Sequence, residues 1–89
     1  MAQTFFPKKH ISIPASPPPP PNTEYKISIG YEKWDNNMNK VIKVQMVYDG
    51  VIAGRRSPSY PLHTDDYERV YKEIEKLYAE DTAAITSVW

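Results

Sequence analysis

The sequence has no cysteine and only three glycines among its 89 residues. Without cysteine, neither a disulfide bond nor a cysteine-based zinc site can stabilise the fold. The chain also lacks the glycine-rich loop that cradles phosphates in nucleotide-binding proteins. Its two histidines, His10 and His63, are far apart, and no motif brings a nucleophile to either of them. We therefore expect a protein that is not an enzyme and that binds no metal, cofactor or small-molecule substrate.

Net charge and long apolar runs are absent as well. Eleven basic and eleven acidic residues cancel, which argues against attachment to nucleic acid or membrane by bulk charge. No apolar run approaches the roughly 20 residues that cross a bilayer, and the N-terminal segment lacks the apolar core of a signal peptide. These absences predict a soluble, cytoplasmic protein that does not bind membranes.

Proline, in contrast, is concentrated in one segment, since residues 14–21 read PASPPPPP. Proline has no backbone N–H and favours the extended polyproline II helix, so this tract cannot lie inside a helix or sheet. We predict an extended proline-rich arm over residues 1–21, a domain over 22–81 and a C-terminal tail over 82–89. A domain of about 60 residues buries only about 60% of its unfolded surface, so its stability is marginal without a partner.

Alternation of apolar and polar residues predicts three strands after the arm, over residues 24–32, 40–48 and 51–57. The pair Asp49-Gly50 between the second and third runs predicts a type I′ turn, because both central positions of that turn need positive φ. This turn places Met46 opposite Ala53.

The rest of the register depends on the first loop and on the length of the third strand. A four-residue loop over 36–39 places Ile27 opposite Tyr48, and it keeps the apolar residues of both strands on one face. A third strand that continues to about residue 57 places Val44 opposite Arg55.

A helix is predicted from Asp65 to about residue 80. Asp65 with Glu68 three residues later is a variant of the capping box. Apolar residues then recur on one stripe. The fold class is α+β, in which a three-stranded antiparallel sheet, in the order β-β-β-α, packs on one C-terminal helix. Six of the seven tyrosines then map to core-facing positions: Tyr25, Tyr31, Tyr48, Tyr67, Tyr71 and Tyr78.

The outer face of the sheet is the first candidate site, because the predicted register leaves a partly apolar surface there that one helix cannot cover. We expect aromatic residues of the arm, from the same chain or from a second copy, to cover it. The predicted partner-binding residues are Trp34, Val41, Val47, Ile52, Phe5 and Phe6. The sequence thus predicts a small accessory or regulatory interaction module that binds another protein or forms a homodimer.

Nucleic-acid binding is the alternative function, because basic side chains of the sheet can contact phosphates. The residues concerned are Lys26, Lys43, Arg55 and Arg56. The balanced net charge withholds the long-range attraction that most nucleic-acid-binding proteins use, so it favours the interaction module.

Overall fold

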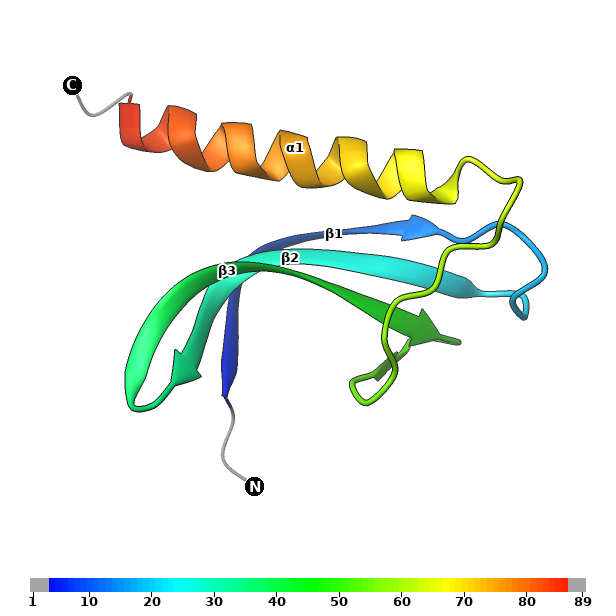
Figure 1. The fold of residues 1–89 in the computed structure, drawn as a ribbon, viewed down its shortest axis with the longest axis horizontal. Helices are drawn as coiled ribbons and strands as arrows, with labels where there is room; N and C mark the ends of the chain where they lie inside the picture. The colour runs from blue at the N-terminus through cyan, green and yellow to red at the C-terminus, as the bar shows by residue number, and fades with distance from the viewer. Residues whose placement is uncertain (1–3, 87–89) are drawn as a thin grey trace.

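A computed structural model describes the backbone of residues 4–86 and the side chains of residues 4–81. Its elements are β1 (Phe5–Pro14), β2 (Thr23–Trp34), β3 (Asn37–Tyr48), β4 (Val51–Ala53) and α1 (Asp66–Thr86). The strands form one antiparallel sheet in the order β1-β2-β3-β4, and α1 lies across one face of it (Figure 1). The predicted α+β class, with an antiparallel sheet packed on a single C-terminal helix, is confirmed.

The sheet has a strand, β1, in the segment that we placed in an extended arm. β1 pairs with β2 along its length, with Ile11 opposite Ile27 and Ile13 opposite Tyr25. Without β1, β2 would be an edge strand with unpaired backbone N–H and C=O groups, and the pairing satisfies these groups. The proline tract forms the connection between the two strands. Phe5, which we expected in the extended arm, is the first residue of β1.

The predicted four-residue loop between the next two strands is wrong. The connection is a two-residue turn at Asp35 and Asn36, with φ of 49° and 67°. Short polar side chains tolerate this left-handed region, so the tight turn forms and lengthens both strands. Ile27 consequently lies opposite Val44 instead of Tyr48. The shift is an even number of residues, so each side chain keeps its predicted face.

The predicted turn at Asp49-Gly50 has positive φ at both residues, 52° and 83°. It places Met46 opposite Ala53 as expected. The prediction that this strand continues to residue 57 is wrong, because β4 ends at Ala53. There the chain turns away from the sheet, and the Arg56 backbone N–H donates to the Ala53 carbonyl at 3.1 Å.

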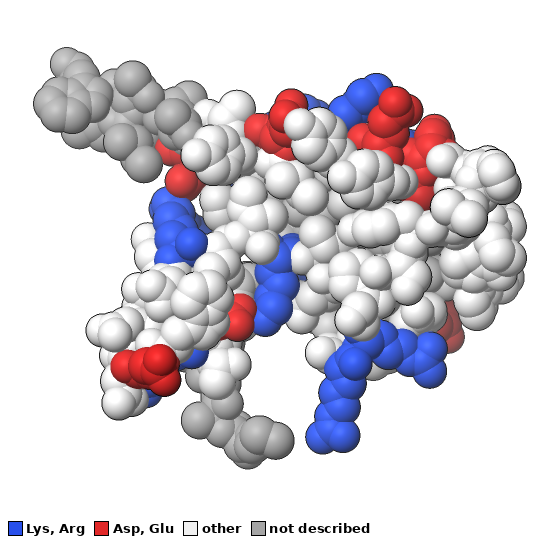
Figure 2. All heavy atoms as spheres, viewed as in Figure 1, with Lys and Arg blue, Asp and Glu red and all other residues white. Residues whose placement is uncertain are grey.

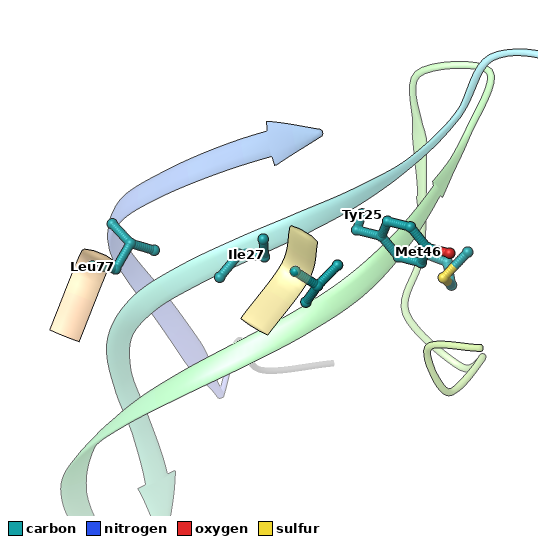
Figure 3. Packing of buried hydrophobic residues seen from close by; sticks show 5 residues of the cluster. Tyr25, Ile27, Met46 and Leu77 are labelled. Carbon is teal, nitrogen blue, oxygen red and sulfur yellow. The ribbon is translucent and has the colours of Figure 1, made fainter. Parts of the chain in front are cut away.

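The core lies between α1 and the middle of the sheet (Figure 3). It is formed by Tyr25, Ile27, Met46, Val70 and Leu77. α1 packs chiefly on β2 and continues to Thr86, so residues 82–86 of the predicted tail are helical. Residues 87–89 lie outside the described residues.

Most of the tyrosines predicted in the core are not buried there. Tyr25 is buried and Tyr48 is half-buried, whereas Tyr31 is exposed on the sheet. On α1, Tyr67, Tyr71 and Tyr78 are 64%, 49% and 65% exposed. The helical spacing of these three residues is correct, but α1 is rotated so that Val70 and Leu77 face the sheet.

A substitution at Gly30 tests whether β1 pairs with β2. A Cβ atom at Gly30 would lie 2.4 Å from the Phe6 carbonyl oxygen and 2.8 Å from Pro7 Cα. We expect Gly30→Ala to lower the free energy of unfolding by about 1–3 kcal/mol, because backbone atoms must move apart. Urea denaturation measures the change. Gly54→Ala is the matched control, since apart from its two chain neighbours no residue comes within 4 Å of a Cβ atom at that position. Equal losses in the two variants would contradict the pairing.

Candidate functional site

Strand β3 has an unpaired edge beside the helix. β4 covers only three residues at the end of β3, so within the described part of the chain no strand pairs with residues 37–45 on the side away from β2. Hydrogen-bonded pairs alternate along antiparallel strands, and the residues that flank a two-residue turn form such a pair. The backbone N–H and C=O groups of Lys40, Ile42 and Val44 therefore point outward. We call these three residues the open edge.

Aromatic side chains of α1 form an exposed row, and the last of them, Tyr78, lines a hollow together with Lys40 and Ile42 of the open edge. The Tyr67 ring lies 6.4 Å from the Tyr71 ring and 5.5 Å from the Tyr60 ring, which in turn lies 5.2 Å from the buried Tyr25 ring. Tyr78 continues the row toward the C-terminal end of the helix. We call Tyr60, Tyr67, Tyr71 and Tyr78, together with the open edge, the tyrosine face.

A hollow of about 320 Å³ lies between the C-terminal half of α1 and β3. Its lining residues are Ile29, Lys40, Val41, Ile42, Tyr78 and Asp81. The Lys40 Nζ donates to Asp81 Oδ1 at 2.7 Å, so the charge at this end is already paired. Figure 2 shows a largely uncharged area below α1, in the middle of the view, with acidic and basic side chains along the top of α1 and basic ones further down.

The residues predicted on the outer face are not equally accessible. Trp34 and Ile52 are exposed, Val41 is half-buried and Val47 is only 6% exposed. Phe6 is exposed on the opposite side of β1 from Phe5, because successive residues of a strand alternate.

One cluster on the outer face combines both sets of predicted residues. Glu32 accepts a bond from Lys43 Nζ at 2.8 Å and one from Trp34 Nε1 at 3.1 Å. The same Lys43 Nζ lies 4.8 Å from the centre of the Phe5 ring. The hydrogen bonds from Lys43 and Trp34 hold the pKa of Glu32 below its ordinary value. The cluster is therefore neutral overall and internally paired.

The basic residues of the alternative function are divided between the two faces of the sheet. Lys26 and Lys43 lie on the outer face, where Lys43 is paired with Glu32. Arg56 lies on the helix-facing side, with its guanidinium 5.4 Å from the Tyr48 ring. Arg55 and Arg56 are both exposed, in the turn that follows β4.

Comparison with protein-family models, curated proteins and solved structures found no match. Among the side chains of residues 4–81 there is no group of three or more His, Cys, Asp or Glu placed to hold a metal ion. The one helix described over residues 4–86 is too polar to cross a membrane.

A buried carboxylate joins the helix to the sheet. Asp66, the first residue of α1, is 0% exposed. Its Oδ2 accepts bonds from the Ser16 backbone N–H at 2.9 Å and from the Tyr25 hydroxyl at 2.7 Å, and its Oδ1 accepts one from Arg69 Nη2 at 2.7 Å. Both oxygens are thus occupied by the chain itself, so we assign the cluster a structural role.

The hydrogen bonds to Asp66 determine the protonation states of Asp66 and Tyr25. Burial alone would raise the pKa of Asp66, but the bonds from Ser16, Tyr25 and Arg69 outweigh it and hold that pKa well below its ordinary value. Burial, followed by the bond to Asp66, raises the pKa of Tyr25 far above its ordinary value. Asp66 is therefore ionised and Tyr25 neutral near pH 7.

Replacing Asp66 should destabilise the fold strongly. Asp66→Asn removes the charge that Arg69 neutralises and leaves an amide NH₂ among donors. We expect a loss of about 3–5 kcal/mol in the free energy of unfolding, measured by urea denaturation. Asp65→Asn is the control, because Asp65 meets Arg69 at an exposed position and should change stability by less than about 1 kcal/mol. Similar losses in both variants would contradict the assigned role.

The same carboxylate should make the fold sensitive to acid. The pKa of Asp66 is lower in the folded chain than its unfolded value of about 3.9, so its contribution is complete above about pH 4 and is lost as the pH falls further. Other carboxylates contribute too, so the informative quantity is the difference between wild type and Asp66→Asn. This difference should shrink below about pH 4; a difference independent of pH would contradict the depressed pKa.

Proposed function

We propose that the chain is a small non-catalytic interaction module that binds another protein through the tyrosine face. The observation that carries the proposal is the exposure of Tyr67, Tyr71 and Tyr78 on α1, with Tyr78 beside Lys40 and Ile42 of the open edge. Large exposed apolar surfaces mark interaction sites, and tyrosine is enriched among residues that dominate binding energy. Its ring buries a large area while its hydroxyl still finds a partner in water or in the complex.

The charge distribution supports the same surface. The chain has no net charge, and Figure 2 shows a largely uncharged area below α1. Binding there would gain its free energy from buried aromatic area and backbone hydrogen bonds rather than from long-range attraction. An accessory or regulatory role in the cytoplasm is part of this proposal.

The outer face supports binding less well. Of its predicted apolar residues only Trp34 and Ile52 are exposed, and the charges of Lys43 and Glu32 neutralise each other. It serves as the internal comparison in the test.

The test selects peptides from a displayed random library against the full chain. We expect selected peptides to bind with micromolar affinity and to lose at least about tenfold, or 1.4 kcal/mol, in the double variant Tyr71→Ser, Tyr78→Ser. Trp34→Ser is the matched control, an exposed aromatic on the other face whose removal should leave affinity unchanged. All these side chains are exposed, so the urea midpoint of each variant should stay close to that of wild type. Loss of binding only in Trp34→Ser, or failure to select any peptide, would overturn the proposal.

A further inference from the structure

Resting on the proposed function, we infer that the tyrosine face binds an extended segment of a partner protein, which adds to the sheet as a strand antiparallel to β3 and carries acidic residues at its N-terminal end. Three features of the described residues support this occupant: the direction of the backbone groups, the position of unpaired positive charge, and the apolar wall formed by α1.

The backbone groups give the mode of binding. Lys40, Ile42 and Val44 each direct one N–H and one C=O outward, as argued above. Main-chain hydrogen bonds supply the affinity when a peptide adds to a sheet edge. β4 already shows how a strand pairs at this edge, with Ala53 opposite Met46. An added segment would continue the line of β4, starting where the chain turns away.

The direction follows from the rest of the sheet. β1, β2, β3 and β4 are all antiparallel to their neighbours, and antiparallel pairing is slightly more stable for each residue. An antiparallel segment has its N-terminal end beside Val44 and its C-terminal end beside Lys40.

Charge without an acidic partner lies beyond the Val44 end of the open edge. Arg55 and Arg56 come two and three residues after β4, and the Arg56 guanidinium lies 5.4 Å from the ring of Tyr48, at the β4 end of β3. Among the described residues neither guanidinium has an acidic partner. At the other end, Lys40 is already bonded to Asp81. Arginine binds carboxylates through strong, often paired hydrogen bonds. The N-terminal end of the segment should therefore carry Asp or Glu.

The helix α1 determines which side chains of the added segment are apolar. Residues of the added strand that share a face with Ile42 and Val44 point toward α1, where they meet Tyr78 and the hollow of about 320 Å³. Apolar side chains fit these positions, and polar ones fit the positions between them.

Three blocked peptides test the inference on the full, isotope-labelled chain by NMR. The first is Asp-Asp-Val-Thr-Ile-Thr-Val-Ser, the second carries the two Asp residues at its C-terminal end, and the third has Lys-Lys in their place. We expect the first to bind at least about fivefold more tightly than the others and to slow amide exchange at Lys40, Ile42 and Val44 by at least about tenfold.

Variants of the chain test whether Arg55 and Arg56 bind the acidic residues of the peptide. The advantage of the first peptide should disappear in the double variant Arg55→Gln, Arg56→Gln. It should persist in Lys72→Gln, the matched control, because Lys72 is an exposed helix residue on the solvated side of α1. Equal binding of the first two peptides, or an advantage that survives the arginine substitutions, would overturn the acidic N-terminal end.

The outcomes also separate this inference from the proposed function. If library-selected peptides bind the tyrosine face without slowing exchange at the open edge, strand addition is wrong and the proposed function stands. If light scattering shows a dimer whose open-edge amides are protected without peptide, a second copy is the occupant and the inference is overturned. If neither the three peptides nor the library yields binding, both are overturned.

Discussion

The buried carboxylate of Asp66 is the contact on which the arrangement of the helix depends. An ionised carboxylate inside a protein costs several kcal/mol unless hydrogen bonds replace its water. Here those bonds come from three parts of the chain: Ser16 in the β1–β2 connection, Tyr25 in β2 and Arg69 in α1. The N-terminal end of α1 is therefore held where these donors meet, above β2.

Ion pairs on either side hold the other end of α1. Lys9 of β1 bonds to Glu80, and Lys40 of β3 bonds to Asp81. In this position α1 packs Val70 toward β2 and leaves Tyr67, Tyr71 and Tyr78 largely exposed. The tyrosine face is thus a consequence of how the helix is anchored, and the candidate function follows from the fold.

Apart from the tight turn at Asp35-Asn36, features with a local cause were predicted from the sequence, and features set by distant contacts were not. The Asp49-Gly50 turn and the amphipathic helix depend on adjacent residues, so their patterns were sufficient. The pairing of β1 was missed because the proline tract suggested an arm. Helical spacing showed that Tyr67 and Tyr71 share a stripe, but not how α1 is rotated over the sheet. That rotation depends on the bond between Tyr25 and Asp66, residues far apart in the sequence, so the candidate site was mistaken for core.

Residue-resolved amide hydrogen exchange on the free chain tests the central claim, that β3 presents an open edge beside the helix. Alternate amides of one strand then differ, because those of Val41 and Lys43 bond to β2 while those of Ile42 and Val44 face outward. We predict that the amides of Ile42 and Val44 exchange at least about tenfold faster than those of Val41 and Lys43. Equal protection of all four amides would contradict it, since the edge would then already be covered.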